Sequence, residues 1–356
     1  MVKETSEKKL IAVMGATGAQ GGAVVEALLK LSDQFEIRAI TRTPESEKAK
    51  ALAANGIEVV KADGDDEDSI TRAFSNAYGA FLVTNFWSDM NMQHEMDQTK
   101  ILQKAVIAAD VKHVVLSTLE DTRLKIKESG DADTWLVLDE KLQSYVPHYD
   151  GKGEVSKEFL ASSAPTTLLY TSFYYDNFIN FGMGPKRYAE DQPLVITFPT
   201  GDKPFFMNSL QDIGESVSAI FQDPSLINTH QGVAGSLHSG EEIADAFSKV
   251  LGVPVVFNAV DTATYASFGF PGAPELANMF RFFTSFKPDY RSIEGSEKLL
   301  GRKTVALVDY IEQNKGAFLP SEPVVKEMSK PEKENKVKGA IMFFKRFFKG
   351  MVGIKQ

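Results

Sequence analysis

The stretch GATGAQGG, residues 15–22, decides the fold of this chain. It follows a short apolar run at 10–14 and precedes a helical pattern of apolar residues from Val24 to Leu29. A strand, a glycine-rich turn and a helix in this order form a cradle for a phosphate, because glycines allow close approach and the helix N-terminus presents free N–H groups. The stretch therefore predicts dinucleotide binding, with an ordinary strand-to-helix turn as the alternative.

The spacing of these glycines indicates which kind of dinucleotide-binding fold to expect. Gly15, Gly18 and Gly21 read G-x-x-G-x-x-G and not the G-x-G-x-x-G of most dehydrogenases. This spacing resembles that of the extended and atypical short-chain dehydrogenase/reductase folds.

Composition limits the classes of function. The chain has 356 residues, enough for one large α/β domain with additions or for two domains. The net charge of −9 argues against a nucleic-acid surface, and no cysteine is present for a disulfide or a thiolate site, so a redox role needs a bound cofactor. We expect no metal site. Residues 1–9 show no leader character and no apolar run reaches roughly 18 residues, which predicts a cytoplasmic protein, with a nuclear or membrane-peripheral location as alternatives.

Strand and helix patterns alternate at short spacing through the first half of the chain. Such alternation predicts an α/β fold, a Rossmann-like doubly wound parallel sheet with helices on both faces. The expected strands are 10–14, 36–41, 58–62, 80–84, 113–117 and 166–171, and the expected helices are 20–32, 45–55, 67–76, 89–110 and 152–162.

The rest of the chain is harder to interpret. We expect residues 8–180 to form the dinucleotide-binding part, interrupted by an irregular charged insertion at 119–147. Residues 181–320 are expected to form a smaller C-terminal, substrate-side lobe. Residues 321–338 are charged and almost without large apolar groups, which predicts a linker.

Residues 339–356 predict a basic amphipathic tail. At about 100° per residue, Lys338, Lys345, Arg346 and Lys349 fall on one side and the phenylalanines on the other. Such a helix can lie on an anionic membrane or dock in a partner's groove, and the alternative is a helix folded back on the body.

The end of the second expected strand bears on cofactor choice. A protein that selects NAD has an Asp or Glu there to bind the ribose 2′-hydroxyl. This chain has Thr41 and Arg42 instead, and the guanidinium can pair with a 2′-phosphate. We therefore expect NADP(H), with NAD(H) bound at lower affinity; an exposed arginine at a strand end is the alternative.

Polar residues follow the third and fourth expected strands. Asp63 and Asp66 can accept hydrogen bonds from an adenine amino group, although Asp66 can equally cap the next helix. Thr84 and Asn85 can bind the ribose or the pyrophosphate. The aromatic residues 86–87 can shelter a nicotinamide or belong to the core.

The catalytic pattern is incomplete. Short-chain reductases use a Tyr and a Lys four residues later, and the Lys lowers the pKa of the phenol so that it exchanges a proton with the substrate. Lys152 is well placed, but His148 stands four residues before it and Tyr149 only three. His148 can act as an acid or base near neutral pH, or be a structural or surface histidine. Lys152 keeps an expected role in holding the ribose.

Several motifs resemble the NmrA-like family of atypical short-chain dehydrogenase/reductase folds. The resemblance runs from about residue 8 to about residue 318, and the later motifs are too specific for a generic Rossmann fold. The motifs are residues 15–22, VTNFW at 83–87, DGKGEV at 150–155, FPTGD at 198–202 and GFPGAPELANMFRF at 269–282.

The resemblance implies NADP(H) binding without established turnover, in a redox sensor that responds to NADPH through dimerisation and a protein partner. It implies that Arg42 binds the 2′-phosphate, that Asp66 lies at the adenine end and that Lys152 lies by the nicotinamide. The pyrophosphate would be held by Gly15, Ala16, Thr17, Gly18, Ala19 and Gln20. The ribose side would be formed by Thr84, Asn85 and Phe86, and the nicotinamide end also by Tyr174, Tyr175, Asp176 and Asn177.

Two hypotheses follow. We favour an NADP(H)-binding regulatory sensor, because the cofactor loop is intact and Tyr-x-x-x-Lys is absent. The alternative is an NADPH-dependent reductase of quinones or similar carbonyls, supported by Lys152, His148 and the aromatic residues 173–175. Glu45 and Glu47 stand where redox-sensor members of the family carry basic residues, and their charge opposes a 2′-phosphate. The insertion at 119–147 and the C-terminus are also longer than in those members.

Overall fold

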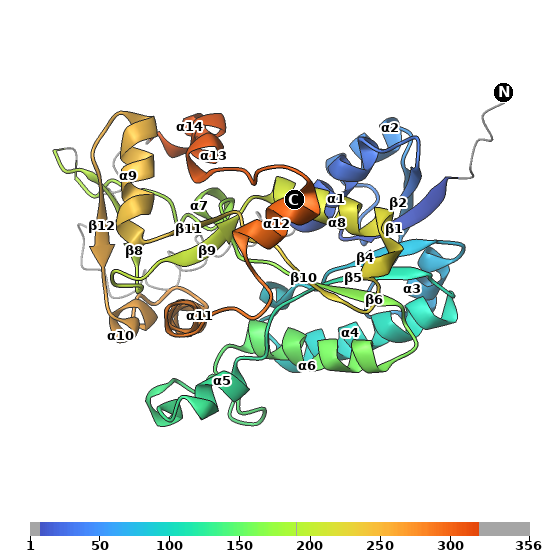
Figure 1. Ribbon diagram of the computed structural model, residues 1–356, viewed down its shortest axis with the longest axis horizontal. Helices are drawn as coiled ribbons and strands as arrows, with labels where there is room; N and C mark the ends of the chain where they lie inside the picture. The colour runs from blue at the N-terminus through green and yellow to red at the C-terminus, as the bar shows by residue number, and fades with distance from the viewer. Residues whose placement is uncertain (1–7, 190, 320–356) are drawn as a thin grey trace.

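The computed structural model describes residues 8–189 and 191–319. Its larger part is a parallel sheet of seven strands in the order β10-β6-β5-β4-β1-β2-β3 (Figure 1). The strands are β1 (Lys9–Met14), β2 (Phe35–Thr41), β3 (Glu58–Lys61), β4 (Gly79–Leu82), β5 (His113–Thr118), β6 (Thr166–Tyr170) and β10 (His230–Gly232). The strand order reverses at β1, with β2 and β3 on one side of it and β4, β5, β6 and β10 on the other. The predicted doubly wound α/β fold is therefore confirmed.

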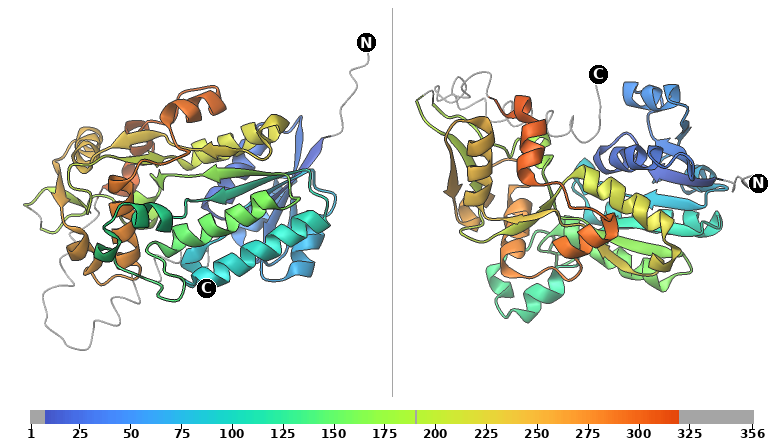
Figure 2. Two further views of the ribbon diagram at one scale, coloured as in Figure 1. Left: turned by 60° about the horizontal axis from the view of Figure 1, so that its bottom comes forward. Right: turned by 45° about the horizontal axis from the view of Figure 1, so that its top comes forward.

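Both faces of this sheet are covered because its strands are apolar on both sides. Ile11 and Val13 of β1 pack in one layer, whereas Ala12 packs in the opposite one. One layer holds α1 (Ala19–Leu29), α2 (Glu47–Ala54) and α8 (Leu210–Gln222). The other holds α3 (Glu67–Phe74), α4 (Met92–Ala108) and α6 (Pro147–Ala161), with α4 and α6 side by side (Figure 2).

The helix expected to start at residue 152 starts earlier. Pro147 occupies the first turn of α6, where its missing N–H costs no hydrogen bond and its fixed φ suits the helix. The expected start was therefore wrong, and the helix begins at Pro147. His148 and Lys152 consequently lie one turn apart on the same helix.

The expected irregular insertion at 119–147 contains α5 (Arg123–Glu128) and a short 3₁₀ turn, η2 (Ala132–Thr134). It is tied to α11 (Ala273–Ser285). Asn278 donates hydrogen bonds to the carbonyls of Leu136 and Tyr145, both at 2.8 Å, and Arg281 donates to the carbonyl of Thr134 at 2.8 Å. The insertion is therefore part of the wall of the smaller lobe.

The smaller lobe is built from short strands and an aromatic core. β7 (Phe173–Tyr174), β9 (Phe205–Asn208) and β11 (Ser236–His238) form one sheet, and β8 (Leu194–Phe198) pairs with β12 (Val255–Ala259). Around Phe280 the rings of Phe198 and Phe205 pack with centroids 5.1 and 5.5 Å away. The remaining helices of this lobe are α7 (Asn177–Asn180), α9 (Gly240–Leu251), α10 (Thr262–Ala266), α13 (Leu307–Gln313) and α14 (Lys315–Phe318).

The chain crosses repeatedly between the two parts. After β9 it returns to the main sheet as α8 and β10, and α12 (Ile293–Leu300) packs on α8 (Figure 1). The residues expected to form the linker and the basic tail lie outside the described residues. Among the described residues, no helix is long and apolar enough to cross a membrane.

Candidate functional site

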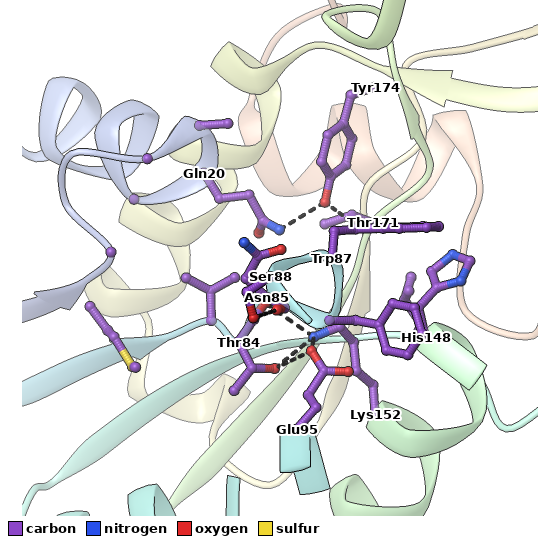
Figure 3. Close-up of a pocket in the computed structure, with 18 of the residues that line it drawn as sticks. Gln20, Thr84, Asn85, Trp87, Ser88, Glu95, His148, Lys152, Thr171 and Tyr174 are labelled. Atoms are coloured by element: carbon purple, nitrogen blue, oxygen red, sulfur yellow. Dashed lines mark hydrogen bonds and ion pairs between the residues drawn. The ribbon is translucent and has the colours of Figure 1, made fainter. Parts of the chain in front are cut away.

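A cavity of about 560 Å³ lies between the carboxyl ends of the main strands and the smaller lobe. Its walls come from both parts of the chain, and Figure 3 shows a portion of its lining. Parallel sheets bind ligands at this edge, where the strand order reverses. The cavity therefore stands where the glycine turn predicted a ligand.

The glycine turn forms one end of the cavity. Gly15 has a φ of +64°, and a Cβ at residue 21 would lie 2.3 Å from the Gly15 carbonyl oxygen, so only glycine fits. The first turn of α1 has no side-chain cap and no acidic residue, whereas α2 and α3 are capped by Ser46 and Asp66. Unpartnered N–H groups at a helix start suit an anion, and these residues therefore fit a dinucleotide pyrophosphate.

Not all of the residues expected to bind the pyrophosphate line the cavity. Gly15, Thr17, Gly18, Ala19 and Gln20 line the cavity. Ala16 does not, because it is buried and its N–H donates to the Ile40 carbonyl at 3.3 Å. Its position holds the turn against the sheet.

Gln20 links the glycine turn to the smaller lobe. Its Nε2 donates to the Tyr174 hydroxyl at 2.8 Å, and its Oε1 accepts from the Ser117 hydroxyl at 2.7 Å. The Tyr174 hydroxyl also lies 3.0 Å from that of Thr171 (Figure 3). Burial raises the pKa of Tyr174 to about 12, so this phenol stays protonated and is not the activated tyrosine of a short-chain reductase.

Arg42 lines the cavity at the carboxyl end of β2 and is exposed. It has no hydrogen-bond or ion-pair partner among the residues described, so its guanidinium is available to a ligand. Lys48, on the first turn of α2, places its Nζ 3.3 Å from the carbonyl of Thr17. Sequence reasoning missed this second cation, which offsets the nearby Glu45 and Glu47.

The acidic loop after β3 divides between two roles. Asp63 lines the cavity with Gly64 and Asp65. Asp66 does not line it, and its carboxylate accepts from the Ser69 N–H at 3.1 Å as the cap of α3. The capping alternative thus describes Asp66, and Asp65 takes the place at the cavity that was expected for it.

His94 joins two acidic loops at this end of the cavity. Its Nδ1 lies 2.5 Å from Asp89 and its Nε2 lies 3.0 Å from Asp65. Hydrogen bonds to Asp89 and then Asp65 raise the pKa of His94 above its ordinary 6.5. The His94 ring therefore links the β3–α3 loop to the start of α4.

We expect His94→Gln to lower the melting temperature at about pH 5.5 but not at about pH 8.5. A pKa raised in the folded state makes protonation favour folding. The contribution is therefore complete below 6.5 and is lost as the pH rises through the raised pKa of His94. Thermal unfolding of both proteins at the two pH values measures this, and an equal difference at both would contradict it.

The expected ribose-side residues Thr84, Asn85 and Phe86 all line the cavity, and so does Lys152. The Lys152 Nζ lies 2.6 Å from Glu95 Oε1, 2.7 Å from Thr84 Oγ1 and 3.3 Å from the Thr84 carbonyl (Figure 3). All three N–H donors of Lys152 are engaged in this way. To hold a ribose, Lys152 has to exchange one of these contacts, of which the longest is the one with the carbonyl.

Glu95, which sequence reasoning missed, is buried on α4 and lines the cavity. Its Oε1 accepts from Lys152 and from Thr84 at 2.8 Å, while its Oε2 is buried without a hydrogen-bond partner. Separating a buried ion pair is costly, because each charge is then left buried without its partner. Glu95 therefore fixes the position of Lys152.

The segment after β6 contributes Tyr174, Asp176 and Asn177 to the cavity. Tyr175 does not line it: this side chain is fully buried, and its hydroxyl lies 2.8 Å from the Ser236 hydroxyl and 3.1 Å from the Val305 carbonyl. Burial raises the pKa of the Asp176 carboxyl. Tyr175 is thus a core residue and not a ligand contact.

Beyond Lys152 the cavity becomes an apolar chamber. Its walls come from the loop after β4, from α6, from the 173–183 segment and from α11. The apolar and aromatic side chains that line it include Phe86, Trp87, Leu119, Tyr149, Phe173, Phe181, Met183, Leu276, Met279 and Phe283.

His148 lines this chamber and is not a surface residue. Its Nδ1 lies 2.5 Å from Glu275 Oε1, and its ring centroid lies 5.0 Å from that of Trp87. Tyr149 is buried beside it, and burial raises the pKa of its phenol. His148 therefore brings an imidazole ring, whose nitrogens can donate or accept a proton, to the wall of the chamber.

Comparison with known proteins agrees with the fold. Among solved structures, the NmrA negative transcriptional regulator in complex with NAD is 18% identical, with a TM-score of 0.70, covering 88% of this chain and 99% of that one. The NADPH-dependent quinone oxidoreductase QOR2 of Escherichia coli, complexed with NADPH, is 24% identical, with a TM-score of 0.66, covering 86% and 99%. The protein is thus of the NAD(P)-binding Rossmann-like fold class.

The family follows from sequence comparison. The model of the NmrA-like family matches residues 7–313. The NmrA-like family domain-containing oxidoreductase notA′ of Aspergillus versicolor is 34% identical over 272 residues, which is 71% of each chain. The chain belongs to the NmrA-like family, and that part of the resemblance is confirmed.

Proposed function

We propose that this chain is an NADPH-dependent reductase of a planar, largely apolar acceptor, such as a quinone or a similar carbonyl compound. One observation carries the proposal: the phosphate cradle and the apolar chamber are parts of a single cavity. A protein that only sensed a dinucleotide would need the cradle but not the chamber. Pockets with apolar walls and a few placed polar groups are typical of small-molecule sites.

In this proposal, some residues of the cavity bind the cofactor and others take part in the reaction. The glycine turn and the start of α1 would hold the pyrophosphate, Arg42 the 2′-phosphate, and Asp63 the adenine end. Thr84 and Asn85 would contact the ribose. NADPH, when bound, supplies a hydride.

His148 supplies the proton that carbonyl reduction also requires. Its ring is held at the chamber wall by Glu275 and Trp87. Lys152 sits one helical turn further along α6, fixed by Glu95, at the boundary between cradle and chamber. The names of the Aspergillus and Escherichia coli proteins, an oxidoreductase and a quinone oxidoreductase, agree with this proposal.

We expect Arg42→Ala to remove most of the preference for NADPH over NADH. A charge-assisted contact with the 2′-phosphate contributes roughly 1.5–3 kcal/mol, so NADPH affinity should fall about tenfold or more while NADH affinity stays nearly constant. Dissociation constants for the two cofactors, measured by fluorescence titration, give the comparison.

A matched control for Arg42 is Lys50→Ala. Lys50 lies on the adjacent helix, pairs with Glu47 at 3.0 Å and does not line the cavity. Its loss should leave both affinities within about twofold, since exposed pairs contribute little. Equal affinity of the unmutated protein for NADPH and NADH would contradict the assignment of Arg42.

The second candidate is the regulatory redox sensor that the sequence favoured. Its support is specific: Tyr-x-x-x-Lys is absent, all three Lys152 donors are engaged, and burial raises the pKa of both Tyr149 and Tyr174. A structural neighbour is named a negative transcriptional regulator. Such a protein would bind NADPH without turnover and change its oligomeric state or a partner contact on binding.

One experiment separates the two candidates. NADPH oxidation is followed with a panel of quinones and aromatic carbonyls, and NADPH affinity is measured on the same preparation. Steady turnover with any acceptor supports the reductase. Tight NADPH binding without turnover, accompanied by an NADPH-dependent change in sedimentation, supports the sensor.

A further inference from the structure

Glu275 of α11 holds His148 of α6 across the wall of the chamber. Glu275 Oε1 accepts the backbone N–H of His148 at 2.8 Å and lies 2.5 Å from its Nδ1. The side chains are 8% and 5% exposed, so this pair is almost entirely buried. We propose that Glu275 is a positioning residue: its carboxylate orients His148 and stabilises its charged ring, and His148 then delivers the proton. This inference rests on the proposed reductase function.

The contacts assign the two ring nitrogens different roles. An oxygen that accepts the backbone N–H is already an acceptor, so Nδ1 must donate its proton to the same oxygen. Nε2 has no hydrogen-bond partner among the residues described and is not sealed from open space. Because His148 lines the chamber, Nε2 is the nitrogen left to meet a substrate.

Aromatic neighbours keep the ring of His148 in this orientation. The centroids of Trp87 and Tyr149 lie 5.0 and 4.9 Å from that of the imidazole, and that of Phe86 lies 5.9 Å away. Rings packed on several sides and a bond to Glu275 prevent the imidazole from flipping. A proton carried on Nε2 is therefore held at a fixed place, as general acid catalysis requires.

A second cavity borders Glu275. This cavity of about 220 Å³ lies outside the chamber, and Leu138 and Asp139 also line it. Glu275 Oε2 has no hydrogen-bond partner among the described residues and is not sealed. This outer cavity borders the carboxylate and is large enough to admit a small carboxylic acid.

The proton balance is simple. After one hydride from bound NADPH has reached the carbonyl carbon, the electron pair of the C=O bond rests on oxygen. That oxygen takes the Nε2 proton of the charged His148 ring. The ring becomes neutral, with its remaining proton on Nδ1 facing Glu275, and water re-protonates Nε2 when the product leaves.

The test uses the full chain with NADPH and menadione, a quinone. Glu275→Gln keeps an acceptor oxygen but removes the charge, and should lower kcat by roughly 10- to 100-fold. KM for menadione and the Kd for NADPH should stay within about twofold, and the solvent deuterium isotope effect on kcat should rise as proton transfer becomes limiting. Glu275→Ala should lose more, and added acetate should restore part of kcat through the outer cavity.

Asp139→Asn is the matched control, because Asp139 lines the same outer cavity and bonds the Leu142 N–H without touching His148. Its kcat should stay within about twofold. An unchanged kcat in Glu275→Gln overturns the positioning role and leaves the reductase standing. A lower kcat together with a higher KM and weaker NADPH binding, none of them restored by acetate, would show a merely structural role for Glu275. That result also overturns the positioning role. Absence of turnover in the unmutated chain overturns both proposals.

Discussion

Gly21→Ala is expected to abolish measurable NADPH binding. A Cβ at residue 21 would lie 2.3 Å from the Gly15 carbonyl oxygen and 2.8 Å from that of Met14. Both are backbone atoms of the turn between β1 and α1, so neither can move aside without reshaping the cradle. We expect a loss of at least roughly 100-fold in affinity, or about 2.8 kcal/mol, measured by isothermal titration.

The neighbouring glycine provides the control for this change. A Cβ at residue 22 would meet nothing closer than the Ala16 carbonyl oxygen at 3.6 Å, an ordinary contact. Gly22→Ala lies inside α1, where alanine reduces the entropy of the unfolded chain and stabilises by about 0.4–1 kcal/mol. It should therefore bind NADPH normally and melt slightly higher. Normal NADPH binding by Gly21→Ala would refute the assignment of the turn as the phosphate cradle.

His148→Ala should lower turnover by roughly 10²–10⁴-fold while leaving NADPH binding unchanged. The substitution removes the Nε2 proton donor but touches neither the glycine turn nor Arg42. The rate is measured with saturating NADPH and the best acceptor from the quinone panel. Because the ring of His148 is buried beside Trp87, the melting temperature of the variant is recorded alongside.

His94→Gln is the control for a histidine in the same cavity. His94 lies at the opposite end, where its ring nitrogens contact Asp89 and Asp65. With saturating NADPH its kcat should stay within about twofold of the unmutated protein. If His148→Ala retains full turnover, His148 is not the proton donor.

The fold was predictable because its signals are local. The glycine turn, the apolar runs and their spacing each depend on neighbouring residues, and they predicted the parallel sheet and the position of the cavity. Errors occurred where one residue type has two local uses. Asp66 could cap a helix or face a ligand, and in the structure it caps α3.

The segment around β7 shows a second kind of limit. The family resemblance assigned both Tyr174 and Tyr175 to the cofactor. Tyr174 ends β7 and lines the cavity, whereas Tyr175 begins the turn that follows and is buried in the core. Which of the two lines the cavity depends on the pairing of β7 with β9, which the sequence alone does not reveal.

The partners of Lys152 and His148 could not be predicted from the neighbouring sequence. Glu95 and Lys152 are 57 residues apart, and His148 and Glu275 are 127 apart. A weak signal existed: Glu95 falls on the same face of α4 as Met92, Met96 and Thr99, which are buried. A carboxylate on an apolar helix face usually has a buried partner, but nothing in the pattern names that partner.

The repeated crossing of the chain between the two parts restricts how this protein can diversify. The chain enters the lobe that forms the chamber at the 119–147 insertion and again after β6, leaves it at α8, re-enters it after β10, leaves at α12 and returns at α13. The lobe is not one continuous segment of the chain. The chamber therefore cannot be exchanged between relatives by replacing a single segment. In the proposed reductase, a change of acceptor would then come from substitution of wall residues such as Phe283 or Met279, with the glycine turn unchanged.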